Sequence, residues 1–219
     1  MTSLDQPTLD VERALARACG PGPRIIAGLD EVGRGALAGP VAIGACALLI
    51  DPDSTIPLLP DGVRDSKLLS PKRRDALVGP IQQAAHATAI GWASAPEIDE
   101  LGIMQALTLA SLRALDGLGV AADAVLLDGS ADVLTSALTE RGAGAPRVQV
   151  RVRADRECAS VAAASVLAKV ARDALMRDLD EVAPMYAWAS NKGYGSAAHR
   201  AAIAQHGPHA QHRRSWNLG

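Results

Sequence analysis

Two adjacent carboxylates, Asp30 and Glu31, end a short apolar run and stand just before a glycine-arginine-glycine turn. The run begins near Ile25 and is too short for a helix and rich in β-branched side chains, so we expect a buried strand. Neighbouring side chains on a strand point to opposite faces, so the two acids cannot form a simple side-by-side dyad. A carboxylate is costly to bury unpaired, and metal ions commonly offset that cost. Gly33 and Gly35 let the backbone approach a ligand closely, with free N–H groups.

Two other interpretations of this segment compete with a metal and ligand site. The acids and the glycine-rich turn also fit an ordinary solvated turn, and this alternative stays open. The spacing of Gly33, Gly35 and Ala38 fits the G-x-G-x-x-G/A fingerprint of dinucleotide-binding proteins. That fingerprint must open a helix, whereas Pro40 interrupts the segment and a new strand is predicted over residues 41–50. We therefore reject the dinucleotide interpretation.

Further acids follow other predicted strands. Asp128 ends the apolar run 124–127, and Asp155 lies just beyond a predicted strand at 148–152. In an open α/β sheet, ligands bind at the carboxyl ends of the strands, so these two acids and Asp30 should converge. Gathered carboxylates repel one another, and Mg²⁺ or Mn²⁺ with oxygen ligands removes the repulsion. Two such ions would activate a water molecule and stabilise the leaving oxygen of a phosphodiester. Each acid alone also fits an ordinary turn residue.

A possible phosphate site stands ahead of a well-marked helix start. Ser70 as N-cap and Pro71 at the first helical position predict a helix that runs to about Ala85. Ser66 and Lys67 precede it, and their hydroxyl and ammonium groups suit a phosphate. The alternative is a solvated basic face.

Three histidines in the basic tail, His206, His209 and His212, have the spacing H-x-x-H-x-x-H. Pro208 breaks any helix through them, and without a helix the three-residue steps give no fixed face. We therefore expect phosphate or surface contacts there rather than a structural metal.

These residues must be positioned by a mixed α/β sheet flanked by helices. Apolar runs predict five strands, at about 25–29, 41–50, 86–93, 124–128 and 148–152. Helical periodicity predicts helices at 11–18, 71–85, 96–118 and 158–182, followed by a basic, loop-rich tail. Residues 1–22 are expected to form an N-terminal appendage, and residues 23–219 the main domain.

Composition narrows the class of protein without identifying it. The chain has 219 residues, 48% of them hydrophobic, and a mean hydropathy of +0.10, which fits one globular domain with a full core. The chain has no run of about 18 apolar residues, so no membrane helix is predicted. The N-terminus lacks the layout of a signal peptide, and three cysteines without CxxC spacing favour a reducing cytoplasm. The net charge of −2 does not exclude nucleic acid, because basic surface can coexist with an acidic metal centre.

Taken together, six segments in register resemble the ribonuclease HII family. The segments are Leu29-Asp30-Glu31-Val32-Gly33-Arg34-Gly35 with Gly39-Pro40, Asp65-Ser66-Lys67-Leu68-Leu69, Leu127-Asp128-Gly129, Ala162-Ala163-Ala164-Ser165-Val166-Leu167-Ala168-Lys169-Val170-Ala171-Arg172-Asp173, Gly193-Tyr194-Gly195-Ser196 and His212-Arg213-Arg214-Ser215-Trp216. The resemblance covers roughly residues 24–217. Any one of these motifs is weak, whereas six in the same order are specific.

The resemblance implies an RNase H-like fold in which a small helical C-terminal portion, about residues 184–219, helps to bind substrate. It implies an endonuclease that cleaves the RNA strand of RNA–DNA hybrids and single ribonucleotides embedded in duplex DNA. Cleavage would fall on the 5′ side of the ribonucleotide at the RNA–DNA junction and leave 3′-hydroxyl and 5′-phosphate ends. The catalytic, metal-binding acids would be Asp30, Glu31, Asp128 and Asp155, with Mg²⁺ or Mn²⁺ as the cofactor. Substrate contacts would come from Gly33, Arg34, Gly35, Ser66, Lys67, Ser165, Lys169 and Tyr194.

The same resemblance gives some of these residues particular roles. The glycine-arginine-glycine turn would meet the 2′-hydroxyl, the group that distinguishes RNA from DNA. Tyr194 would stack on the sugar of the next, deoxy residue, and Ser66 and Lys67 would hold phosphate.

One departure from the family pattern bears on the fourth acid. Arg153-Ala154-Asp155 stands where the family more often has Lys-Gly-Asp, so Glu157 competes for this role. The spacing from Asp155 to Ser165 matches the family and favours Asp155.

Three alternatives to the full activity are a nuclease restricted to RNA–DNA hybrids, an inactive nucleic-acid-binding relative and a phosphatase acting on small molecules. The intact set of acids opposes the inactive relative, and the basic tail opposes the phosphatase. We expect a monomer with no obligate protein partner.

Overall fold

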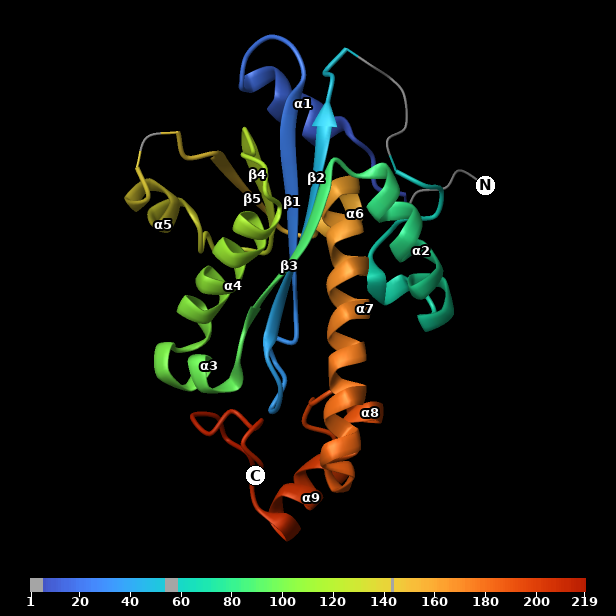
Figure 1. Cartoon of the computed structure of the whole chain (residues 1–219), viewed down its shortest axis with the longest axis vertical. Helices are drawn as coiled ribbons and strands as arrows, with labels where there is room; N and C mark the ends of the chain where they lie inside the picture. Colours follow the sequence, from blue (N-terminus) through green and yellow to red (C-terminus); the bar gives the residue numbers. More distant parts are fainter. Residues whose placement is uncertain (1–5, 54–58, 143) are drawn as a thin grey trace.

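A mixed five-stranded sheet forms the centre of the computed structural model, which describes residues 6–53, 59–142 and 144–219 (Figure 1). The strands are β1 (Arg24–Val32), β2 (Val41–Ile50), β3 (Ala87–Ala93), β4 (Ala124–Asp128) and β5 (Arg147–Arg151). Their order is β3-β2-β1-β4-β5, with antiparallel pairing among β1, β2 and β3 and parallel pairing among β1, β4 and β5. The predicted fold class is confirmed.

A long helix, α7 (Ala159–Val182), covers one face of the sheet and crosses β1 and β2 at very short range. A Cβ added to Gly28 of β1 would lie 2.4 Å from the backbone carbon of Ser160. A Cβ added to Gly44 of β2 would lie 2.2 Å from the carbonyl oxygen of Ala164. The alanine-rich sequence of α7 and the glycines beneath it are thus two sides of one close contact.

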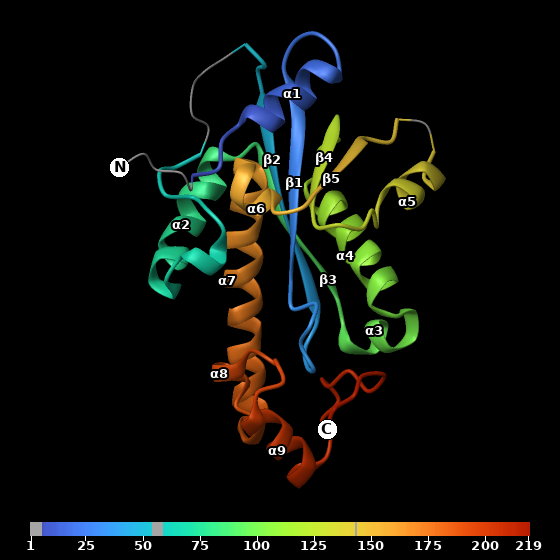
Figure 2. The same cartoon turned by 180° about the vertical axis from the view of Figure 1, so that it is seen from behind.

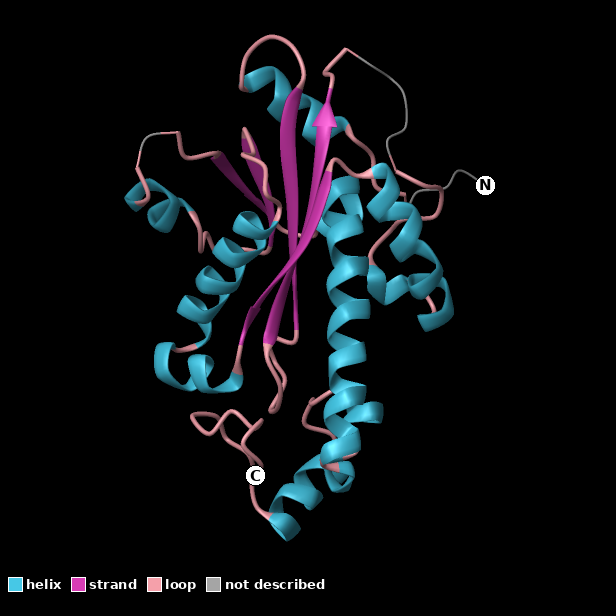
Figure 3. Ribbon diagram, viewed as in Figure 1, coloured by secondary structure: helices cyan, strands magenta, loops and turns pink. Residues whose placement is uncertain are grey.

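The opposite face is covered by α3 (Ala95–Leu101) and α4 (Ile103–Gly117), so helices flank the sheet on both sides (Figure 3). The prediction of one helix over 96–118 was wrong. Gly102 separates the two helices with a φ of 77°, a left-handed conformation that interrupts an α-helix and that glycine adopts readily.

Four further helices complete the main body. They are α1 (Asp10–Ala18), α2 (Pro71–Ala84), α5 (Thr135–Glu140) and α6 (Ala154–Glu157), of which the last two were not predicted. Helix α2 begins as predicted, because the Ser70 hydroxyl accepts the N–H of Arg73. Helix α1 packs into the core through Leu15, and its buried Glu12 accepts the N–H of Ser160 at the start of α7.

The C-terminal portion lies beyond the far end of α7 and contains α8 (Trp188–Asn191) and α9 (Ala197–His206) (Figure 2). It has its own apolar cluster, which includes Trp188 and also Leu37 from the connection between β1 and β2. The tail therefore packs against the glycine-arginine-glycine turn. Within the described residues, no helix is both long and apolar enough to cross a membrane.

Candidate active site

Asp30 and Glu31 lie inside β1, which continues to Val32, rather than at its end. Asp30 is buried and faces the Ser165 hydroxyl on α7. Glu31 is half-buried, and its Oε1 lies 3.5 Å from Arg34 Nη1. Burial raises the pKa of Glu31, while Arg34 lowers it. The two side chains thus leave the strand in different directions, as the alternation of a strand requires.

Asp128 is the last residue of β4, which runs parallel to β1. Its Oδ1 accepts the backbone N–H of Ala154 at 2.7 Å, which holds the start of α6 against the end of β4. Asp155 follows on α6 and is buried. Glu157, its competitor in the sequence, instead accepts a hydrogen bond from Arg151 Nε at 2.6 Å on the exposed surface.

The buried acids form one electrostatic cluster, although three separate elements carry them. Burial raises the pKa of Asp30 to about 8, and repulsion from Asp128 and Asp155 adds to that rise. The Ser165 hydroxyl and the Lys67 ammonium oppose it. Burial, followed by repulsion from Asp128, also raises the pKa of Asp155. The ionised form of the cluster is therefore unfavourable, because the surrounding protein compensates its negative charge only in part.

The chemistry of this cluster fits a hard divalent cation, because all its donors are carboxylate oxygens and their charges repel one another. As they stand, no three His, Cys, Asp or Glu side chains of the described residues are arranged to hold an ion. Lys67 Nζ lies 3.4 Å from Asp155 Oδ2 and 4.0 Å from Asp65 Oδ1, so an ammonium group supplies part of the missing positive charge. The donor set fits Mg²⁺ or Mn²⁺, and the carboxylates would have to close around the ion.

One cleft brings most of the predicted site residues together. Its lining includes Asp30, Glu31, Gly33, Arg34, Gly35, Ser66, Lys67, Ser165, Lys169 and Tyr194. Asp128 lines an adjoining hollow that shares Glu31 and Arg34 with this cleft. Asp155 is linked to the cleft through Lys67. Asp30 and Glu31 thus line the same cleft as the residues expected to touch substrate, whereas Asp128 and Asp155 lie beside it.

Two of the predicted substrate contacts are engaged within the protein. Ser66 is buried, and its Oγ accepts a hydrogen bond from Ser165 Oγ at 2.9 Å. Lys169 Nζ lies 2.7 Å from Asp173 Oδ1. Lys169 would have to leave Asp173 to bind a phosphate, and the Ser66 hydroxyl is buried, whereas the largely exposed Lys67 is better placed to do so.

Three residues of this region had no role in the sequence-based site. Asp65 is buried, accepts the N–H of Lys67 at 2.9 Å and raises the pKa of Asp155. Its place at the start of the family-like segment 65–69, beside Ser66 and Lys67, was the signal for it. Arg172 and Arg213 are fully buried beneath the glycine-arginine-glycine turn, although both lie within the family-like motifs.

The tail histidines differ from expectation. His206 is exposed, but His212 is buried, so the expected surface contact is wrong for His212. His212 Nε2 lies 3.0 Å from His199 Nε2, which also accepts the indole N–H of Trp188. His199 Nδ1 lies 2.9 Å from the carbonyl oxygen of Tyr194, and only a protonated nitrogen can make that bond. The pair therefore ties the tail to the Tyr194 loop.

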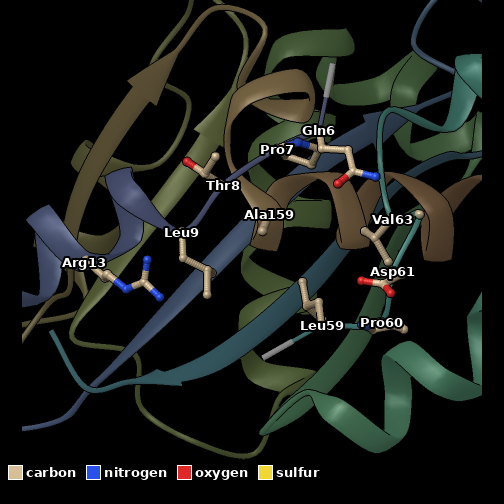
Figure 4. A pocket seen from close by; sticks show the side chains of 11 residues that line it. Gln6, Pro7, Thr8, Leu9, Arg13, Leu59, Pro60, Asp61, Val63 and Ala159 are labelled. Atoms are coloured by element: carbon tan, nitrogen blue, oxygen red, sulfur yellow. The ribbon is translucent and has the colours of Figure 1, made fainter. Parts of the chain in front are cut away.

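A second hollow lies between residues 6–9 and 59–63, with Arg13 and Ala159 at its wall (Figure 4). No predicted site residue is among those that line it in the part of the chain that the structure describes. We assign no chemistry to it.

A mixed sheet of this order, with carboxylates gathered from β1, β4 and α6, defines an RNase H-like nuclease. Comparison with known proteins narrows the class. The profile of the family described as Ribonuclease HII matches residues 27–218. Ribonuclease HII of Streptomyces avermitilis is 44% identical over 213 residues, which cover 97% of this chain and 84% of that protein. The chain belongs to the ribonuclease HII family and is a ribonuclease H-type endonuclease.

Solved structures agree with this assignment. The crystal structure of the ribonuclease H2 from Pyrococcus horikoshii OT3 superposes with a TM-score of 0.71 and 28% identity, covering 89% of this chain and 94% of that one. Bst-RNase HIII, solved in complex with Mn²⁺, superposes with a TM-score of 0.65 and 20% identity over 88% of this chain and 65% of its own. At that identity the second likeness supports the fold alone.

Proposed function

We propose that this endonuclease cleaves the RNA strand of RNA–DNA hybrids and single ribonucleotides embedded in duplex DNA. Cleavage falls on the 5′ side of the ribonucleotide at the RNA–DNA junction, leaves 3′-hydroxyl and 5′-phosphate ends, and requires Mg²⁺ or Mn²⁺. The observation that carries the proposal is that the glycine-arginine-glycine turn lines the same cleft as Asp30 and Glu31. A turn that reads the 2′-hydroxyl and acids that support cleavage would then face the same nucleotide.

Gly35 supports a close approach of substrate to this turn. A Cβ added there would meet no heavy atom within 4 Å, and its φ is not left-handed, so the fold itself gives no reason for glycine. Free space beside an exposed backbone suits a sugar hydroxyl. Arg34 and Gly35 also have no acceptor for their N–H groups among the described residues.

The four acids, Asp30, Glu31, Asp128 and Asp155, would hold the metal ions. Bound there, the ions supply an activated water and stabilise the leaving oxygen of the phosphodiester. Lys67, whose Nζ lies 3.4 Å from Asp155 Oδ2, is largely exposed and would hold a substrate phosphate beside these acids.

Tyr194 would lie against the sugar on the DNA side of the junction. Its side chain is 38% exposed at the cleft, and the Arg172 guanidinium carbon lies 5.7 Å from its ring centroid. A flat ring held in this way would present a face to the sugar and would disfavour an added 2′-hydroxyl there.

The test offers the protein a labelled DNA duplex with one internal ribonucleotide, an RNA–DNA hybrid and an all-DNA duplex, with Mg²⁺, Mn²⁺ or a chelator. Metal-dependent cutting 5′ of the single ribonucleotide supports the proposal. Cutting of the hybrid alone restricts the activity, and cutting of neither refutes it.

Asp128→Asn tests the metal-ligand role in the same assay. The amide removes the charge but keeps an oxygen that can accept the Ala154 N–H. The variant should stay folded and bind the duplex yet scarcely cut it. Full cutting by this variant would overturn the metal-ligand role of Asp128.

A further inference from the structure

Two buried arginines hold the substrate-facing loops entirely through main-chain carbonyls. Arg213 is fully buried and donates to the carbonyl oxygens of Gly33 (Nη2, 2.6 Å), Arg34 (Nη1, 2.7 Å) and Gly39 (Nε, 3.1 Å). No carboxylate pairs with it in the part of the chain that the structure describes. Its side chain therefore acts as a rigid fork that fixes the curvature of the glycine-arginine-glycine turn.

Arg172 joins that turn to the loop carrying Tyr194. It is fully buried and donates to the carbonyl oxygens of Pro40 (Nε, 2.9 Å), Ala38 (Nη2, 3.2 Å) and Lys192 (Nη1, 2.9 Å). Its guanidinium also faces the Tyr194 ring. The N–H groups of Leu37 and Ala38 also join the two loops, because both donate to the carbonyl oxygen of Gly193, at 2.8 and 3.2 Å. Arg172 thus adds side-chain hydrogen bonds to a direct main-chain link between the two loops that line the cleft.

The glycines around these arginines fit this arrangement. A Cβ added to Gly33 would lie 2.1 Å from Arg172 Nε, and one added to Gly193 would lie 2.3 Å from the carbonyl oxygen of Ala38. Both glycines have left-handed φ values, 85° and 82°. Only glycine at these two positions lets the two loops and Arg172 pack together.

Burying two guanidinium groups without carboxylate partners costs free energy of folding. Burial lowers the pKa of Arg172, and burial followed by repulsion from Arg172 lowers the pKa of Arg213 to about 9. A pair of apolar side chains would fill this space without that penalty. They would not hold carbonyl oxygens inward.

We propose that Arg172 and Arg213 are positioning residues for ribonucleotide recognition. By holding the carbonyls of residues 33–40 inward, they present the opposite side of the turn, with the N–H groups of Arg34 and Gly35, to the 2′-hydroxyl. By holding Lys192 as well, Arg172 acts together with the main-chain bonds to Gly193 to keep Tyr194 at a fixed distance from that turn. This inference rests on the proposed function.

The test uses Arg172→Lys and Arg213→Lys, because lysine keeps the charge but cannot reach three separated carbonyls. Each is made in an Asp128→Asn background so that binding can be measured without cutting. Fluorescence anisotropy with Mg²⁺ gives the Kd for a DNA duplex with one ribonucleotide and for the same duplex made only of DNA. The readout is the discrimination ratio, which is the Kd for the all-DNA duplex divided by the Kd for the duplex with one ribonucleotide.

Each lysine variant should lower that ratio about tenfold, the effect of losing hydrogen bonds made by a charged group, with the all-DNA Kd unchanged. Arg177→Lys, an exposed change on the same helix, should leave both values unchanged. Ile81→Ala, which empties a buried site on α2, controls for lost stability and should keep the ratio. If the lysine variants do not fold, Arg213→Gln, which is neutral, takes the same test.

Two results would overturn the inference. In one, the parent protein discriminates between the duplexes and the arginine variants keep its full ratio. In the other, both Kd values rise by the same factor, which indicates a purely structural role. A parent that neither discriminates nor cuts in the Asp128 form would instead refute the proposed function, and this inference with it.

Discussion

Gly33 and Gly35 flank the same arginine yet should respond to alanine in opposite ways. At Gly35 the backbone is not left-handed and an added Cβ meets nothing within 4 Å. Alanine there should leave the free energy of unfolding unchanged, or raise it by about 0.4–1 kcal/mol by restricting the unfolded chain. At Gly33 the φ of 85° alone should cost alanine about 1–2 kcal/mol. Contact with Arg172 Nε at 2.1 Å must add to that loss.

Activity should separate the two variants in a different way. The methyl group of Gly35→Ala would occupy the space that we assign to the 2′-hydroxyl, so kcat/KM on a single-ribonucleotide duplex should fall about tenfold or more, which is about 1.4 kcal/mol. Gly33→Ala should lose activity together with stability. Urea unfolding and initial rates on one labelled duplex measure both quantities.

The comparison can fail in two ways. A Gly35→Ala protein with unchanged stability and full activity would show that substrate does not use the open space beside this turn. A Gly35→Ala protein less stable than Gly33→Ala would contradict the backbone geometry itself. Either outcome would remove the main support for the hypothesis that this turn recognises the 2′-hydroxyl.

Three further predictions concern other parts of the site. Tyr194→Ala should reduce the preference for the RNA–DNA junction more than it weakens binding to all-DNA duplex, and equal losses would refute the stacking role. Because the pKa of Asp30 is raised to about 8, the free energy of unfolding in a chelator should fall as the pH rises from 6.5 to 8. Melting curves of Asp30→Asn should show little of this fall. Because burial lowers the pKa of His212 to about 4, its NMR titration should have a midpoint near that value, and stability should fall as the pH drops from 6.5 toward it. A midpoint near 6.5 would contradict the buried pair with His199.

Much of the fold could be predicted because its signals are local. Strand β1 ends at Val32, directly before the glycine-rich turn, and its neighbour over 41–50 is a continuous apolar run. Ser70 and Pro71 mark a helix start by their own chemistry. The acids could be grouped because strand ends in such sheets meet at one edge.

The misses share a different physical cause. Gly102 divides a helix because of its backbone conformation, and the apolar period on either side continues as if it did not. Buried arginines and histidines look like surface residues in a sequence. Arg172, Arg213 and His212 owe their burial to carbonyl and ring-nitrogen partners distant in the chain, and no local pattern encodes those partners.

The charge distribution follows from the same arrangement and explains why the net charge of −2 says little about nucleic acid. Carboxylates gather where β1, β4 and α6 meet, and their excess negative charge suits metal ions. Beneath the adjoining turn lie two guanidinium groups, Arg172 and Arg213, which make all their hydrogen bonds to neutral carbonyls. A positive charge with no carboxylate partner in a low-dielectric interior is weakly screened, so it acts on the cleft surface above it. We therefore expect a polyanion to be attracted toward these arginines at one end of the cleft, and toward the other end once bound ions neutralise the acids.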